Sequence, residues 1–83
     1  MEMNKEEIFL KLQNIMADLF EIDPEKITLE ANLYEDLDID SIDAVDLAIE
    51  VRDLTGRGIN PDDFKKVRTV ADLVDAAKDI LDS

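Results

Sequence analysis

Apolar residues return every three or four positions in three separate stretches of this chain, and no other feature constrains its fold as much. This spacing puts them on one side of an α-helix, whereas a half-buried strand would alternate apolar and polar residues. The members of the three stripes are Ile8, Leu12, Ile15 and Leu19; Ala44, Leu47, Ala48, Val51 and Leu54; and Val70, Leu73, Val74, Ala77 and Leu81. No stretch shows a strand pattern or an internal repeat, so the sequence predicts an all-α fold.

Capping signals indicate where the first and last helices begin. Asn4 followed by Glu7 has the spacing of a capping box and predicts a first helix that extends to about Phe20. Thr69 with Asp72 three residues later has the same spacing and predicts the start of the last helix.

Two further helices are expected between these. Asp40 is the expected N-cap of a second helix over residues 41–54. The sequence Asn-Pro-Asp-Asp at 60–63 combines a cap, a proline at the first helical position and acids in the first turn. It predicts a short third helix over 61–66, with Phe64 as its apolar anchor.

The connection between the first and second helices is unusually long, at residues 21–40. Five apolar residues recur along it and are expected to pin it across a helical bundle: Ile22, Ile27, Leu29, Leu33 and Leu37. One helical turn is expected near residues 29–32. The predicted fold is a small four-helix bundle with a long first loop and a short third helix.

The charge balance restricts the classes of function. Nine Lys and Arg residues against 22 Asp and Glu give a net charge of −13, so nucleic acid is not an expected partner. The chain has no Cys and no His, which excludes disulfides, thiolate and imidazole ligands, and a Ser–His pair. With 83 residues, 46% of them hydrophobic, residues 1–83 are expected to fold as one domain without a deep enzymatic cleft.

The N-terminal residues and the apolar runs indicate where in the cell the protein is located. Glu2, Glu6 and Glu7 place acid where a signal peptide needs positive charge. No run approaches the roughly 18 consecutive apolar residues of a membrane span. We expect a cytoplasmic protein with no membrane span, and we expect it to be a monomer.

Ser41 stands at the start of the second helix, in the most acidic part of the chain. A helix start offers unpaired N–H groups and the positive end of a dipole, which suits a group that carries a phosphate. Residues 27–51 contain no basic residue and eight acidic ones: Glu30, Glu35, Asp36, Asp38, Asp40, Asp43, Asp46 and Glu50. These carboxylates suit a basic protein partner.

Catalysis by Ser41 is not expected. A nucleophilic serine needs a base to take its proton, the chain has no His, and all six Lys lie outside residues 27–51. Glycosidases use paired carboxylates, but 83 mainly helical residues offer no sugar cleft. Neither a serine hydrolase nor a glycosidase is therefore expected from these residues.

The alternating acids Asp36, Asp38 and Asp40 are similar to the first ligands of a calcium-binding loop. Such a loop then needs a glycine where this chain has Ser41, and a bidentate Glu where it has Leu47. We expect no specific metal site, while loose binding of divalent cations by the carboxylates stays open.

Two interpretations of Ser41 remain. An exposed serine before an acidic, partly apolar helix could receive a phosphoryl-linked group from a separate enzyme. It could also be a residue that only helps to cap the helix. The residue type and its place at a helix start are compatible with both interpretations.

The second helix has three different sides at 100° per residue. Besides the inner stripe, one side carries only acids, which is ordinarily a solvated face, and another carries Ile42, Val45 and Ile49. Periodicity does not decide whether this second apolar stripe is core or a docking patch. We predict that Leu47, Val51 and Leu54 are buried and that the second stripe is partly exposed and meets partners.

Residues 37–43 read Leu-Asp-Ile-Asp-Ser-Ile-Asp, which resembles the attachment motif of acyl carrier proteins, usually Leu-Gly-x-Asp-Ser-Leu-Asp. The resemblance extends to the long first loop, the acidic second helix, Ile-Asn-Pro-Asp at 59–62 and Val-Arg-Thr-Val at 67–70. Asp38 stands where the family usually has Gly, and Ile42 where it usually has Leu. With Thr-Gly-Arg-Gly at 55–58, these departures suggest a specialised member.

By this resemblance, Ser41 would carry phosphopantetheine, installed from coenzyme A by a phosphopantetheinyl transferase. The thiol would hold acyl chains as thioesters for acyl-loading, condensing and other acyl-processing enzymes with basic docking patches, in fatty-acid, polyketide or related biosynthesis. The partner-binding residues that the family implies are Asp40, Ile42, Asp43, Val45, Asp46, Ile49 and Glu50. The alternative is an acidic helical adaptor that docks a basic partner while Ser41 stays unmodified.

Overall fold

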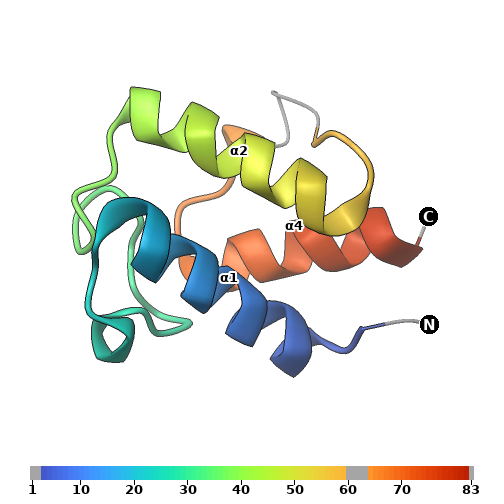
Figure 1. Cartoon of the computed structure of the whole chain (residues 1–83), viewed down its shortest axis with the longest axis horizontal. Helices are drawn as coiled ribbons and strands as arrows, with labels where there is room; N and C mark the ends of the chain where they lie inside the picture. Colours follow the sequence, from blue (N-terminus) through green and yellow to red (C-terminus); the bar gives the residue numbers. More distant parts are fainter. Residues whose placement is uncertain (1–2, 60–63, 83) are drawn as a thin grey trace.

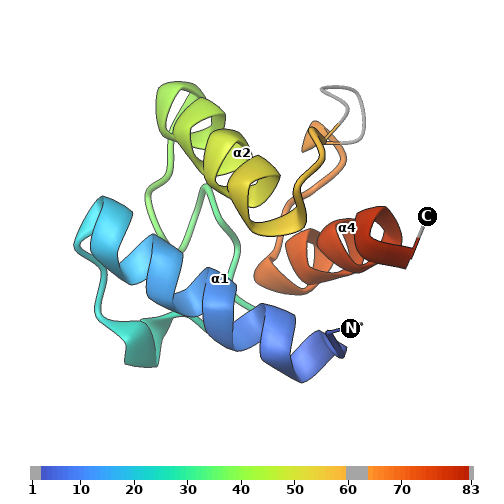
Figure 2. The same cartoon turned by 45° about the vertical axis from the view of Figure 1, so that its right-hand side comes forward.

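The structure, a computed structural model, describes residues 3–59 and 64–82 and is built from helices (Figures 1 and 2). Its elements are α1 (Lys5–Phe20), the 3-10 turn η1 (Pro24–Lys26), α2 (Ser41–Thr55) and α4 (Val70–Asp82). In the described part of the chain, β-type pairing is limited to one isolated bridge between Asn32 and Thr69. The all-α prediction is confirmed. The described residues hold three α-helices instead of the four expected, and the helix predicted over 61–66 begins outside them.

Local capping sets the start of α1 where the sequence predicts it. The Asn4 Oδ1 accepts a hydrogen bond from the Glu7 backbone N–H at 2.8 Å, which satisfies one donor of the first turn. The helix completely buries the side chains of Ile8, Leu12 and Met16. Leu19, the last member of the apolar stripe, is not part of this core. Leu19 is 38% exposed because it lies in the last turn and borders an open hollow.

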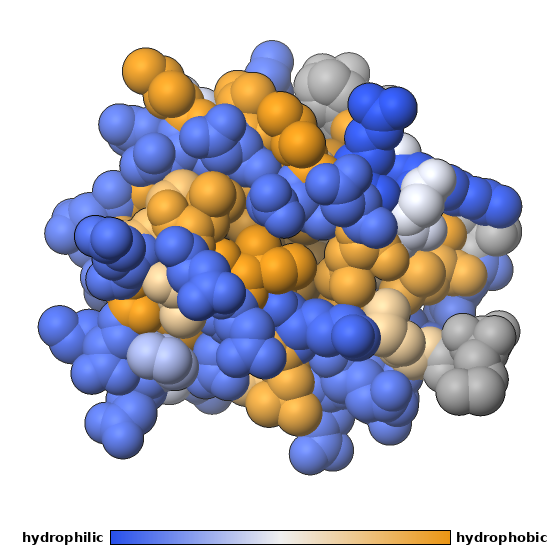
Figure 3. All heavy atoms as spheres, in the orientation of Figure 1, coloured by the Kyte–Doolittle hydropathy of each residue, from blue (hydrophilic) through white to orange (hydrophobic). Residues whose placement is uncertain are grey.

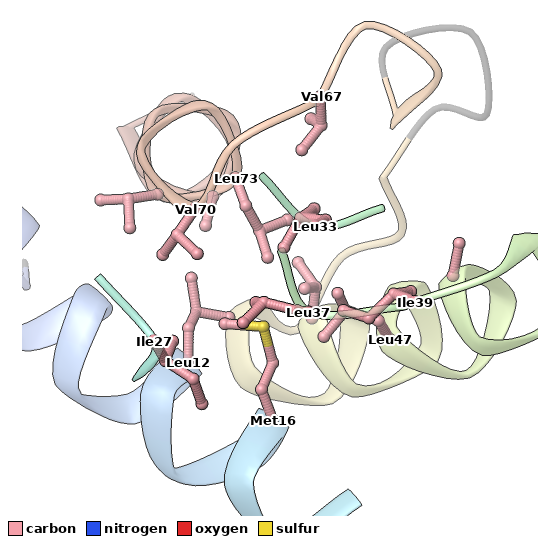
Figure 4. Close-up of a cluster of buried hydrophobic side chains, with 14 of the residues drawn as sticks. Leu12, Met16, Ile27, Leu33, Leu37, Ile39, Leu47, Val67, Val70 and Leu73 are labelled. Carbon is pink, nitrogen blue, oxygen red and sulfur yellow. The ribbon is translucent and has the colours of Figure 1, made fainter. Parts of the chain in front are cut away.

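The connection between α1 and α2 is held mainly by its own apolar residues. Those that are buried are Ile27, Ala31, Leu33, Leu37 and Ile39. Figure 4 shows Leu33 and Leu37 among side chains from α1, α2 and α4, so the connection contributes to the same core as the helices. Leu29 was expected to help pin the loop, but it is 43% exposed.

The helical turn of the connection lies at Pro24–Lys26, not at residues 29–32 as expected. Asp23 supplies the cap, since its Oδ1 accepts a hydrogen bond from the Glu25 N–H at 3.0 Å. Pro24 supplies a φ that is already near the helical value. The Gln13 Nε2 of α1 then donates to the Pro24 carbonyl at 2.8 Å, which fastens this turn to the helix.

The start of α4 is joined to the connection by backbone hydrogen bonds. The Val70 N–H donates to the Ala31 carbonyl at 3.0 Å, beside the bridge between Asn32 and Thr69. The predicted capping box is present, because the Thr69 Oγ1 accepts from the Asp72 N–H at 3.2 Å and the Asp72 Oδ2 accepts from the Thr69 N–H at 3.3 Å. The buried residues of α4 are Val70, Leu73, Val74 and Ala77. This pairing holds in place the segment that leads to Ser41.

Candidate functional site

Asp40 caps α2 and Ser41 does not. The Asp40 Oδ1 accepts hydrogen bonds from the backbone N–H groups of Ile42 at 2.9 Å and Asp43 at 2.8 Å. Asp43 completes a capping box, since its Oδ2 accepts from the Asp40 N–H at 3.5 Å. The N-cap expected from the sequence is confirmed, and the helix extends to Thr55.

Ser41 is the first residue of α2, and its side chain is exposed. Its hydroxyl makes no hydrogen bond to another residue in the part of the chain that the structure describes. The local structure therefore makes no use of this hydroxyl, and the interpretation of Ser41 as a capping residue fails. A phosphate attached here would meet the positive end of the α2 dipole and the negative charge of the acids around it.

Asn32 organises the turn that leads to Ser41. Its Oδ1 accepts hydrogen bonds from the N–H groups of Tyr34 and Glu35, both at 2.9 Å. Its own N–H donates to the Asp36 Oδ2 at 2.7 Å. The sequence patterns described above do not predict this role for Asn32. The available signal was its residue type, because an asparagine can bond to backbone groups two or three residues ahead and so start a turn.

Asp38 has a left-handed backbone conformation, with φ of 55°. The residues on either side of it, Leu37 and Ile39, are buried, and the Ile39 N–H donates to the Leu33 carbonyl at 3.0 Å. Glycine enters this region at little cost, and aspartate is among the few other residues that enter it with some frequency. The left-handed backbone at this position therefore explains why the motif usually has glycine there.

The two apolar stripes of α2 have different environments. Ala44, Leu47 and Val51 are buried. Ile42, Val45 and Ile49 are exposed by 74%, 60% and 52%. In Figure 3 apolar atoms project along the upper edge, where α2 runs in Figure 1, with hydrophilic atoms around them. The predicted choice of core face is confirmed, except that Leu54 is only half-buried.

In the sequence, the acids expected to bind partners lie close to the residues of the exposed apolar stripe. Asp40 and Asp46 are exposed, and Asp43 and Glu50 are half-buried. Because Asp40 and Asp43 also take part in the cap, their carboxylates combine a structural role with a surface charge. The role of these residues toward partners stays a prediction.

Residues 3–59 and 64–82 can also be searched for a metal site and for a membrane-spanning helix. No group of three or more His, Cys, Asp or Glu side chains is placed there to hold a metal ion. Asp36 and Asp40, the first and third acids of the calcium-like pattern, accept backbone hydrogen bonds within the chain. Within the same residues, no helix combines the length and the apolar character that crossing a membrane requires.

Known proteins are similar to this chain over most of its length. The family model described as a phosphopantetheine attachment site matches residues 10–77. Acyl carrier protein 2 of Ralstonia nicotianae is 49% identical over 79 residues, covering 95% of this chain and 98% of that protein. The acyl carrier protein of Lactobacillus acidophilus is 42% identical over 76 residues, covering 92% of this chain and 95% of that protein.

A solved structure has the same fold. The acyl carrier protein of Enterococcus faecalis matches with a TM-score of 0.76 and 31% identity, covering 93% of this chain and 98% of that one. The family model, the relatives and the fold agree over most of the chain. The chain therefore belongs to the acyl carrier proteins, which hold acyl groups on covalently attached phosphopantetheine and catalyse no reaction themselves.

Proposed function

We propose that Ser41 is the attachment site of phosphopantetheine and that residues 1–83 act as one carrier domain. The observation that carries this proposal is the exposed Ser41 hydroxyl, which the fold leaves without a hydrogen bond to another described residue while Asp40 caps the helix. A hydroxyl in this position is accessible to a transferase. Converting this hydroxyl to a phosphodiester requires no rearrangement of the cap.

The transfer needs little from the carrier beyond that hydroxyl. The Ser41 Oγ attacks the phosphorus next to the pantetheine part of coenzyme A, and an O–P bond forms. The pyrophosphate P–O bond breaks, adenosine bisphosphate leaves, and the serine proton passes to a base of the transferase. Because the transferase supplies the base and the metal ion, the absence of histidine from this chain does not prevent the reaction.

The exposed stripe and its acids give the carrier a docking face. This face is made up of Ile42, Val45 and Ile49 with Asp40, Asp43, Asp46 and Glu50. Apolar side chains at the centre and charges around them are the usual composition of a transient interface. The partners proposed are the phosphopantetheinyl transferase and acyl-loading, condensing and other acyl-processing enzymes with basic patches, in fatty-acid, polyketide or related biosynthesis.

The proposal includes a cytoplasmic, monomeric carrier. A net charge of −13 opposes association between copies of the chain, because like charges repel whenever two surfaces approach. The same negative charge attracts basic partners and increases the rate at which they meet the docking face.

The experiment is an intact-mass measurement after incubation with coenzyme A and a broad-specificity transferase. One added phosphopantetheine is expected in the wild type and none in Ser41→Ala, and peptide mass spectrometry should place the group on the fragment that contains Ser41. Modification that persists in the variant, or a group found on Thr28, Thr55, Thr69 or Ser83, would contradict the assignment. If several competent transferases leave the folded wild type unmodified, the adaptor without a prosthetic group becomes the better interpretation.

A further inference from the structure

Asn32 stands at the centre of the segment that joins the start of α4 to the start of α2. Its side-chain Oδ1 accepts hydrogen bonds from the N–H groups of Tyr34 and Glu35. Its carbonyl accepts from the N–H groups of Asp36 at 2.9 Å and Leu37 at 3.2 Å. Its own N–H donates to the Asp36 Oδ2 at 2.7 Å. Both the backbone and the side chain of this one residue therefore close the same turn.

The turn begins from a part of the chain that is firmly held. Asn32 forms the isolated bridge with Thr69, and its neighbours Ala31 and Leu33 are buried. The Leu33 N–H donates to the Arg68 carbonyl at 2.8 Å, and the Ala31 carbonyl accepts from the first residue of α4 at 3.0 Å. The core and the start of α4 thus fix Asn32 in place.

The other end of the turn leads to Ser41. The Ile39 N–H donates to the Leu33 carbonyl at 3.0 Å, so the chain that leaves the turn returns to the segment paired with α4. Ile39 is itself buried, and the next residue, Asp40, caps α2. The hydrogen bonds of Asn32 therefore help to fix the path of the residues that precede Ser41.

A fixed path before Ser41 matters because a transferase binds the backbone around the hydroxyl as well as the hydroxyl itself. Ordering a loose segment on binding costs free energy, and a segment that is already ordered avoids this cost. When only a fraction of the molecules has the ordered segment, the apparent affinity falls in proportion to that fraction. Loss of the turn should therefore weaken binding of the carrier and leave the subsequent phosphoryl transfer unchanged.

We propose that Asn32 is a positioning residue for the modification of Ser41, and that it keeps residues 33–40 ordered before the transferase binds. This inference rests on the proposed function of Ser41. Asn32 acts through the backbone of the turn and takes no part in the reaction, since its side-chain oxygen already accepts from Tyr34 and Glu35.

Steady-state kinetics with coenzyme A, a broad-specificity transferase and the carrier as the varied substrate test the proposal. Asn32→Ala removes the oxygen acceptor and should raise KM about two- to fivefold with kcat unchanged, because the lost hydrogen bonds weaken the ordered turn. Asn32→Ser keeps an oxygen that can start such a turn more weakly and adds no charge, so its KM should lie between those of the wild type and Asn32→Ala.

Asn4→Ala is the matched control. It also removes an asparagine Oδ1 that accepts a backbone hydrogen bond, at 2.8 Å from the Glu7 nitrogen, but at the start of α1. Its KM should equal that of the wild type. All variants are measured at a temperature at which circular dichroism shows them to be folded.

Amide hydrogen exchange of the unmodified carrier gives a second readout that needs no transferase. The Ile39 N–H lies between the turn and Ser41, and its bond to the Leu33 carbonyl has to open before it exchanges. Asn32→Ala should increase its exchange rate about three- to tenfold above that in Asn4→Ala, as expected when one or two hydrogen bonds that oppose the opening are lost.

The outcomes separate this inference from the function on which it rests. If Asn32→Ala has the KM of Asn4→Ala, the inference is overturned, even where Ile39 exchanges faster, while the role of Ser41 stands. A lower kcat with an unchanged KM would also overturn it, because Asn32 would then affect the reaction and not the binding. Equally raised KM values in Asn32→Ser and Asn32→Ala would show that the oxygen acceptor is not responsible. A wild type that no transferase modifies would remove the proposed function and this inference with it.

Discussion

Asp40 and Ser41 are neighbours with separate roles at the start of α2. Asp40 accepts two backbone hydrogen bonds from the first turn, while the Ser41 hydroxyl is exposed and makes none to another described residue. The cap at the helix N-terminus therefore does not depend on the Ser41 hydroxyl. At this scale, Asp40 makes the cap, and the Ser41 hydroxyl, the proposed site of modification, takes no part in it.

Asp40→Ala should lower the free energy of unfolding by about 0.5–2 kcal/mol, the usual cost of losing an N-cap. Asp40→Asn keeps an acceptor and should cost much less, although it removes the same charge. Ser41→Ala should leave the helical circular-dichroism spectrum nearly unchanged while it abolishes modification. Urea unfolding measures the first two changes. Equal losses for Asp40→Ala and Asp40→Asn would show that charge, and not the cap, matters at this position.

Gly56 ends α2 with φ of 77°, and its N–H donates to the Arg52 carbonyl at 2.8 Å. Gly56→Ala should destabilise the protein by about 1 kcal/mol, because an L-residue is strained in this conformation even where space is open. Gly58→Ala is the matched control: its Cβ also meets open space and its φ is not in the left-handed range, so the change should stay within about 0.5 kcal/mol. Equal effects in thermal unfolding would contradict the assignment of Gly56 as the cap.

At the scale of the elements, α2 carries two apolar stripes, one buried and one exposed. Leu47 and Val51 contribute to the core that α1, α4 and the connection share, whereas Val45 and Ile49 stay exposed. The connection supplies buried side chains of its own, so it is part of the bundle and not a loose loop. The shared core therefore holds α2 in place, with Ser41 at its start and the proposed docking face along it.

Leu47→Ala should cost about 2–5 kcal/mol, since it removes a fully buried side chain from the core. Val45→Ala, on the same helix, should change stability by no more than about 0.5 kcal/mol and should weaken the binding of partner enzymes. Chemical unfolding and a binding titration measure the two effects. A greater loss of stability in Val45→Ala would mean that the core face of α2 is assigned wrongly.

The whole molecule combines a folded core with strong electrostatic repulsion. Its net charge is −13, and residues 27–51 hold eight acidic residues and no basic one. Lys5 forms an ion pair with Asp75 at 2.8 Å between α1 and α4, and the hydrogen bond and charge of Asp75 raise the pKa of Lys5. This pair is distant in sequence from the acids around Ser41, so it leaves their mutual repulsion in place.

Magnesium or sodium chloride should therefore raise the Tm, because salt screens exposed charges over about 8–10 Å at ordinary ionic strength. For a domain of this size, each kcal/mol of stabilisation raises Tm by about 4–8 °C. Magnesium should act more strongly at equal ionic strength, since a divalent ion is attracted to clustered carboxylates. Thermal unfolding in both titrations measures the effect. A Tm that stays constant in both would show that this repulsion does not limit stability.

Much of the fold and of the site could be predicted because the interactions concerned are local. The caps at Asn4, Asp40 and Thr69 bond to groups two or three residues ahead, so the sequence near each one determines where its helix starts. The place of Ser41 at the first position of α2 follows from the same local rule.

Other features depend on contacts between distant segments. Leu19 and Leu29 have the spacing of core residues, yet the elements that would cover them lie elsewhere in the bundle. Both apolar stripes of α2 have the spacing of a helix face. Packing against α1 and α4 decides that Leu47 is buried and Val45 is not. The hollow that Leu19 borders exists because the last turn of α1 lies next to residues 37–39. Periodicity places a side chain on one side of its helix, but burial depends on which neighbour covers that side, and only the tertiary structure decides this.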